Sequence, residues 1–173
     1  MKRQFLGDSY DAVKRMWHEI LLVWAPLYTE PRFIPLELRQ GFTKLTRIPV
    51  LTEDHPQSYS ILNDPDTGIR LPAKQNQKVG RAHVTIAFIA DQLRTKGPRC
   101  VITFDQSVYR NHKLKPKDQR TAKMLRLAEE GFPSFYYSSH APSLFAARDA
   151  ESLEKLKKSL TSAGVPKERF EDL

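Results

Sequence analysis

Acidic residues follow apolar segments at three separate places in this chain. The segments lie at residues 5–7, 60–63 and 101–104, and the acids that follow them are Asp8, Asp64 with Asp66, and Asp105. A fourth segment, residues 134–139, is followed by His140. Carboxylates bind divalent metals through oxygen, and an imidazole moves protons near neutral pH. The pattern therefore predicts a metal site, provided that the fold brings these positions together.

Parallel strands would bring them together. If the four segments are strands of one parallel sheet, their carboxyl ends meet at one crevice, where open α/β folds bind ligands. We expect Asp8, Asp64 and Asp105 to hold Mg²⁺ or Mn²⁺ there, with Asp66 as an additional ligand. Asp64, Asp66 and His140 would be the catalytic residues, with His140 moving protons.

The sequence Asn63-Asp64-Pro65-Asp66-Thr67-Gly68 favours a sharp turn at the end of a strand. Pro65 lacks an N–H and stops strand pairing, and Gly68 permits a positive φ, so both carboxylates could be exposed. The alternative is a plain turn in which the aspartates accept hydrogen bonds from their own backbone. An EF-hand is excluded because Lys74 stands where that calcium loop needs a glutamate.

The segment Gly7-Asp8-Ser9-Tyr10-Asp11 would lie where the first strand turns into a helix. Asp8 and Ser9 could simply cap that helix. The functional alternative places Asp8 beside Asp64, with Lys14 and Arg15 one turn further on, where they could bind a phosphate. Neither a G-x-G-x-x-G sequence nor a P-loop lysine motif occurs in the chain, so the common dinucleotide and ATP cradles are absent.

Basic residues dominate the segment after Asp105. We expect Gln106, Arg110, Lys113 and Lys115 to contact substrate, because a basic segment beside a carboxylate crevice suits a phosphodiester backbone. The formal net charge of +8 also favours a polyanion, and nucleic acid or a nucleotide is the expected partner. A solvated helix face is the alternative explanation.

Length and composition limit the class of protein. With 173 residues, the chain is expected to form a single α/β domain over residues 1–173. No apolar stretch approaches the roughly 18 to 20 residues that span a bilayer, so we expect no membrane contact and a cytoplasmic location. Cys100 is the only cysteine, which excludes an internal disulfide, and its apolar neighbours predict a buried thiol.

Helical and strand patterns alternate along the chain. Helices are predicted at residues 10–25, 36–45, 86–96, 117–130 and 150–163, and strands at 5–8, 48–51, 60–64, 99–105, 134–140 and 143–147. A polar loop is expected from residue 67 to 81. This order predicts a three-layer, Rossmann-like α/β domain with a mainly parallel sheet. The two consecutive late strands predict an antiparallel C-terminal edge.

Residues 7–15, 62–69 and 102–106 together resemble a set of uncharacterised bacterial proteins. Those proteins carry a Gly-Asp first turn, an apolar strand ending Asp-Pro-Asp-(Asn/Thr)-Gly, and another strand ending in polar residues. That group remotely resembles Rossmann-fold adenine N6-methyltransferases, whose strand-end motif is (Asp/Asn)-Pro-Pro-(Tyr/Phe). Here Asn63-Asp64-Pro65-Asp66 occupies that place, without the second proline or the aromatic residue, and the glycine-rich loop for S-adenosylmethionine is missing. The resemblance implies a Rossmann-like fold.

Three functions stay open on the sequence. The leading hypothesis is a metal-dependent phosphodiester hydrolase, nuclease-like, acting on nucleic acid or a nucleotide with Mg²⁺ or Mn²⁺. One alternative is a non-catalytic α/β module that binds nucleic acid or a protein. The other, which follows from the resemblance, is a methyltransferase-like enzyme using S-adenosylmethionine.

Overall fold

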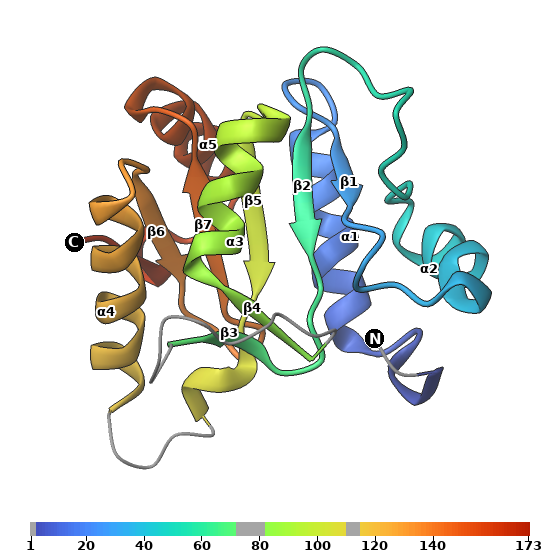
Figure 1. Cartoon of the computed structure of the whole chain (residues 1–173), viewed down its shortest axis with the longest axis horizontal. Helices are drawn as coiled ribbons and strands as arrows, with labels where there is room; N and C mark the ends of the chain where they lie inside the picture. The colour runs from blue at the N-terminus through green and yellow to red at the C-terminus, as the bar shows by residue number, and fades with distance from the viewer. Residues whose placement is uncertain (1–2, 72–81, 110–114) are drawn as a thin grey trace.

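A six-stranded sheet forms the centre of the protein, in the order β1-β2-β5-β7-β6-β8 (Figure 1). The computed structural model describes residues 3–71, 82–109 and 115–173. The strands of the sheet are β1 (Leu27–Thr29), β2 (Ser60–Asn63), β5 (Cys100–Phe104), β6 (Ser134–Tyr137), β7 (Ser143–Ala147) and β8 (Phe170–Glu171). Strands β1, β2 and β5 pair in parallel, whereas β7 is antiparallel to both β5 and β6. The chain is therefore a mixed α/β protein with a mostly parallel central sheet.

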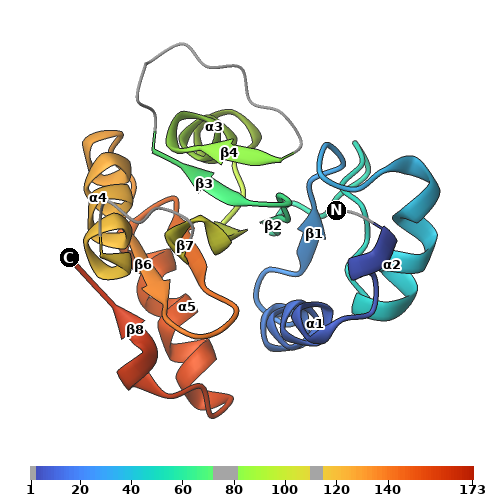
Figure 2. The ribbon, with the colours of Figure 1, turned by 90° about the horizontal axis from the view of Figure 1, so that it is seen from below.

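Helices cover both faces of this sheet. The helices are α1 (Ser9–Leu21), α2 (Arg39–Thr46), α3 (Ile86–Asp91, continued by a π-helical turn, Gln92–Lys96), α4 (Pro116–Glu129) and α5 (Ala150–Ser162). Short 3-10 turns lie at Arg3–Phe5, Leu36–Leu38, Gln106–Tyr109 and Lys167–Arg169. Figure 2 shows α1 and α5 on one side of the sheet and α3 and α4 on the other. In the described residues, no helix has the length and apolar character needed to cross a membrane.

Two apolar clusters fill the space between the sheet and its helices. Trp17 of α1 and Leu156 of α5 pack with Ile102 of β5 on one face, and Ile89 of α3 and Leu127 of α4 pack with Val101 on the other. Every residue of β5 is buried, because a strand with helices on both faces has no solvated side. That double burial explains why β5 is a continuous apolar run in the sequence.

The loop expected after residue 66 contains regular structure that the sequence pattern did not indicate. Strands β3 (Gly68–Arg70) and β4 (His83–Thr85) pair in parallel as a separate two-stranded sheet. Each strand is three residues long, too short for a period of two to stand out among polar neighbours. Residues 72–81 of that loop, including Lys74, lie outside the described residues.

Three predictions about the sheet need correction. The strand predicted at residues 48–51 is reduced to a single bridge between Val50 and Thr29. The segment 5–8 is not a strand: residues 3–5 form a 3-10 turn, and the first strand is β1, which the sequence pattern did not predict. The two late strands do pair antiparallel, but β7 lies inside the sheet between β5 and β6, and the edge strand is β8. The long connection from β5 through α4 to β6 leaves a gap beside β5, which β7 fills.

Cys100 is fully buried in β5, as the sequence predicted, and this makes its reactivity a probe of unfolding. Burial raises the pKa of this thiol to about 12, and a hydrogen bond to Ser60 lowers it only in part. Against a usual value of about 8.5, the thiolate fraction falls by about three orders of magnitude. We expect Ellman's reagent to label the native protein only as fast as it unfolds. Complete labelling within seconds under native conditions, as in denaturant, would contradict the buried position.

Candidate active site

A cavity of about 240 Å³ opens at the carboxyl ends of β2 and β5, beside the start of α1. Its lining includes five residues that the sequence predicted for the site, namely Asp8, Lys14, Asp64, Asp66 and Gln106. Aromatic rings from Phe5, Tyr10 and Phe104 line it as well. The structure thus brings acidic, basic and aromatic side chains from three distant segments to one place.

The charge at the floor of this cavity is organised around Lys14. Its ammonium donates to Asp64 Oδ2 at 2.8 Å and to Asp11 Oδ1 at 3.0 Å, and the lysine side chain is 8% exposed. Burial by itself would lower the pKa of Lys14, but the ion pairs with Asp64 and Asp11 outweigh it and raise that pKa. Lys14 is therefore a fixed cation at neutral pH rather than a base.

Asp11 is a site residue that the sequence analysis missed. It is buried, and it joins the cavity to the turn before α1, since Asp11 Oδ2 accepts the backbone N–H of Gly7 at 2.7 Å. The signal was present in the spacing, because residues three apart on a helix share a face and Asp11 precedes Lys14 by three. Asp8 caps the same helix: its Oδ1 accepts from the N–H groups of Tyr10 and Asp11.

Asp64 and Asp66 both line the cavity but differ in how deeply they are buried. Asp64 is 3% exposed, and it accepts from Lys14 through Oδ2. Asp66 is half-buried and lines the same cavity. Both carboxylates could therefore contact a ligand in the cavity.

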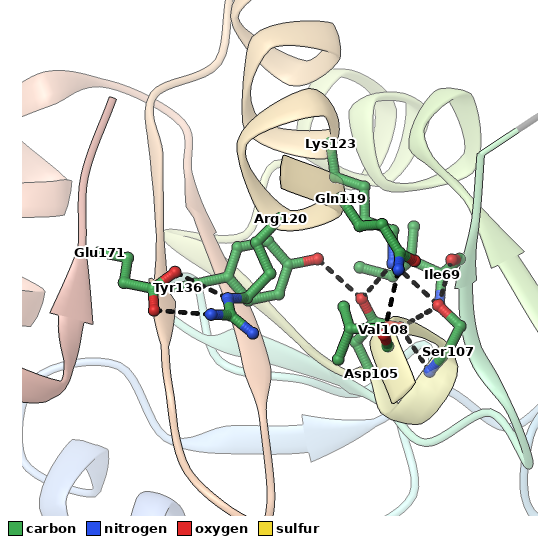
Figure 3. A network of polar contacts seen from close by, with 9 residues as sticks. All are labelled: Ile69, Asp105, Ser107, Val108, Gln119, Arg120, Lys123, Tyr136 and Glu171. Carbon is green, nitrogen blue, oxygen red and sulfur yellow. Dashed lines mark hydrogen bonds and ion pairs between the residues drawn. The ribbon is translucent and has the colours of Figure 1, made fainter. Parts of the chain in front are cut away.

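Asp105 lies on the opposite face of the sheet, in a network with α4 and β6 (Figure 3). Its Oδ2 accepts from Lys123 at 2.5 Å and from the Tyr136 hydroxyl at 2.7 Å, and its Oδ1 accepts from the backbone N–H of Ile69 at 2.8 Å. All of Asp105 is buried. Burial raises the pKa of Tyr136 well above its usual value, and Asp105 raises it further. Burial also lowers the pKa of Lys123, against the opposing effect of Asp105.

Strand register explains why Asp105 does not join Asp8 and Asp64. Asn63 of β2 pairs with Thr103 of β5, so Asp64 is level with Phe104 rather than with Asp105. Successive residues point to opposite faces, and Phe104 and Gln106 both line the cavity while Asp105 faces α4. The three predicted metal ligands therefore do not converge: Asp64 and Asp105 both follow strands but face opposite sides of the sheet, and Asp8 caps α1.

Asp105 nevertheless shapes the cavity indirectly, through the loop that carries Asp64 and Asp66. The Asp105 carboxylate accepts the backbone N–H of Ile69. The preceding residue, Gly68, packs against Asp105 and has a φ of +117°. A Cβ at position 68 would overlap Asp105 Oδ1 and come within 2.8 Å of Asp105 Cα. The glycine of the Asp-Pro-Asp-Thr-Gly sequence is needed for this contact as well as for its backbone angle.

The other predicted site residues lie outside the cavity lining. His140 is exposed, and its ring stacks on Tyr10 with centroids 5.9 Å apart. Arg15 pairs with Glu19 on the surface of α1, and Lys115 is exposed at the start of α4. Arg110 and Lys113 lie outside the described residues.

The basic face expected on α4 is partly turned inward. Lys123 is 1% exposed and pairs with Asp105, and Arg120 pairs with Glu171 at 2.6 Å. Lys115 and Lys117 are exposed at the start of the helix. The cationic surface of this region is therefore smaller than the sequence suggested.

The cavity suits a metal ion that is bound jointly by the protein and a ligand better than a metal ion that is bound by protein side chains alone. Over residues 3–71, 82–109 and 115–173, no three His, Cys, Asp or Glu side chains are placed to hold an ion. Mg²⁺ commonly takes one or two carboxylates together with waters and substrate phosphates. Asp64 and Asp66 could supply those carboxylates, so the donor set fits this mode.

Replacement of Gly68 by alanine should cost much more stability than a matched glycine replacement. Gly97 also has a positive φ, but a Cβ there meets no atom within 4 Å. We expect Gly97→Ala to lose about 1 to 2 kcal/mol of unfolding free energy from backbone strain alone. Gly68→Ala should lose about 1 to 3 kcal/mol more, from the clash with Asp105. Equal losses in urea denaturation would show that the contact with Asp105 is not tight.

Comparison with protein-family models, curated protein sequences and solved structures gave no match. The family resemblance inferred from the three sequence segments stays a prediction.

Proposed function

We propose that the cavity is the active site of a metal-dependent phosphodiester hydrolase that acts on nucleic acid or a nucleotide. The observation that carries the proposal is the meeting of Asp8, Asp64 and Asp66 with the buried ammonium of Lys14 in one cavity. That cavity lies where parallel strands end, the usual ligand position in open α/β sheets. The proposal includes a Rossmann-like, three-layer arrangement, supported by helices on both faces of the sheet.

Asp64 and Asp66 are the residues that would hold Mg²⁺ or Mn²⁺, with Asp8 at the start of α1 facing the same space. A divalent ion would supply a nucleophilic water and neutralise charge on the phosphate oxygens. Asp105 is not part of this set, because it faces α4 and both of its oxygens accept hydrogen bonds.

The side chains of the cavity have separable tasks in hydrolysis. Water adds to phosphorus, the P–O ester bond breaks, and the leaving oxygen takes a proton from solvent. The Asp66 oxygen that does not bind the metal would accept the proton of the attacking water, and Lys14 fixes the Asp64 carboxylate and offsets its charge. His140 stacks on Tyr10 rather than lining the cavity, so the proton transfer is assigned to Asp66.

Nucleic acid or a nucleotide is the proposed partner because of charge. The net charge of +8 attracts polyanions, and Lys115 and Lys117 are exposed beyond the end of β5. The cavity itself is acidic, which favours a bound cation between its carboxylates and a phosphate. The net positive charge of the protein attracts the nucleic acid, whereas the carboxylates of the cavity repel its phosphates. We therefore expect phosphate binding in the cavity to depend on a metal ion.

Cleavage of DNA, RNA and cyclic-nucleotide substrates with Mg²⁺ or Mn²⁺ tests the proposal. We expect saturable metal-dependent turnover that EDTA removes and that Asp64→Asn and Asp66→Asn each reduce by about 100-fold or more, as for loss of a group that stabilises the transition state. Asp54→Asn, in an exposed loop, is the matched control. Near-UV circular dichroism should report native packing for each variant.

Intact substrates with every metal would sink the proposal, as would unchanged cleavage by both cavity variants. Salt-sensitive binding without turnover, unaffected by Asp64→Asn or chelator, would instead favour a non-catalytic binding module. The Asp66 variant guards against a trivial result, because Asp64→Asn also weakens the buried pair with Lys14.

A second candidate, a methyltransferase-like enzyme, is favoured by one observation. Rings of Phe5, Tyr10 and Phe104 lie beside carboxylates, a lining that suits a ligand with an aromatic base and a cationic centre. S-adenosylmethionine has both. If this candidate holds, isothermal titration of S-adenosylmethionine into the protein in EDTA should give a measurable heat of binding with a Kd in the micromolar range. Asp8→Asn should abolish that heat. Absence of heat at millimolar ligand removes this candidate.

A further inference from the structure

We propose that the nucleotide entering the cavity is unpaired, so that the protein acts on single strands or strand ends rather than on the interior of a duplex. The inference rests on the proposed function and names its substrate class. It is drawn from the depth of the carboxylates, the aromatic rings at the cavity and the local charge. Free nucleotides and unpaired strands share the required chemistry, an exposed base face joined to a phosphate.

Depth is the first argument. Asp64 is 3% exposed and Lys14 is 6% exposed, so the reactive floor lies beneath the molecular surface. The cavity holds about 240 Å³, which is too small for a segment of duplex. A duplex presents its phosphates on a broad convex wall with the bases stacked inside, and that shape cannot reach such a floor. One nucleotide that is free to leave its neighbours can.

Aromatic side chains supply the second argument. Tyr10 contacts Phe104, with ring centroids 5.0 Å apart, and His140 stacks on Tyr10 at an interplanar angle of 29°. Phe5 lines the cavity and is 46% exposed. His140 and Phe5 therefore present exposed ring surfaces around the cavity. Base stacking on such rings is the common, sequence-tolerant way to hold unpaired nucleotides.

Charge supplies the third argument. Three carboxylates and one ammonium line the cavity, so a bare phosphate meets net repulsion there. Attraction by the net charge of +8 brings a strand to the surface but does not place it in an acidic cavity. Stacking gives a local favourable contribution that does not depend on charge. In this arrangement His140 is a stacking residue, held in orientation by Tyr10.

Binding measured without hydrolysis tests the inference. Fluorescence anisotropy is recorded with labelled oligonucleotides of about 15 nucleotides, as single-stranded DNA, single-stranded RNA and a hairpin duplex, in Ca²⁺ and again in EDTA. We expect single strands to bind at least about tenfold more tightly than the duplex in one or both buffers. Adenosine monophosphate should compete, and inorganic phosphate at the same concentration should not.

Ring-removing variants assign that preference to the cavity. Phe5→Ala and His140→Ala should each raise the single-strand Kd by about tenfold, as expected for loss of one base stack, and leave duplex binding unchanged. Leu36→Ala, on a residue that is 76% exposed, is the matched control. Melting temperatures should stay near that of the unaltered protein, because both rings are exposed.

Equal affinity for single strand and duplex, or an unchanged ratio in both ring variants, overturns the inference. The result is separable from that of the proposed function. Metal-dependent cleavage that is lost in Asp64→Asn, without a preference for single strands, would support the hydrolase proposal and refute the single-strand inference. A preference for single strands without turnover would support the single-strand inference and refute the hydrolase proposal.

Discussion

The buried ion pair between Lys14 and Asp64 is the interaction on which the rest of the site depends. It joins α1 to the end of β2 and sets one wall of the cavity. A lone charge at that depth would be strongly unfavourable, and removing one partner of such a pair commonly costs about 3 to 5 kcal/mol. Asp105 and Lys123 form a corresponding pair on the other face of the sheet. Two strand-end carboxylates are thus each neutralised by a lysine from a covering helix.

The two pairs divide the acidic strand ends into different roles. Asp64 lines the cavity and accepts from Lys14 through Oδ2, whereas both oxygens of Asp105 accept hydrogen bonds within the protein. Through Ile69 and the close approach of Gly68, Asp105 fixes the loop that presents Asp64 and Asp66. The proposed chemistry then needs few groups: two carboxylates that face a ligand, one fixed ammonium, and rings that hold a base. The remaining acids shape the scaffold.

Much of the fold was predictable because its elements carry strong local signals. Pro116, the Thr85 cap and the Asp149 cap mark helices whose apolar faces recur at regular spacing, and β5 is apolar throughout. Strand β1 was missed because it has three residues and lies among prolines. The face of the sheet to which the Asp105 side chain points could not be predicted, because it depends on strand register. A shift of one residue in the pairing of β2 and β5 would move the carboxylate to the other face. Sequence gives the strand end but not the pairing that decides this.

The most direct test of the central claim is anomalous diffraction from crystals soaked with Mn²⁺ and a non-hydrolysable dinucleotide. We expect one manganese peak in the cavity, bound by Asp64 and by a phosphate oxygen, with no peak beside Asp105. We also expect Lys14 to keep its contact with Asp64 in that complex. A manganese ion bound by Asp105, or a dinucleotide seated away from the cavity, would contradict the account.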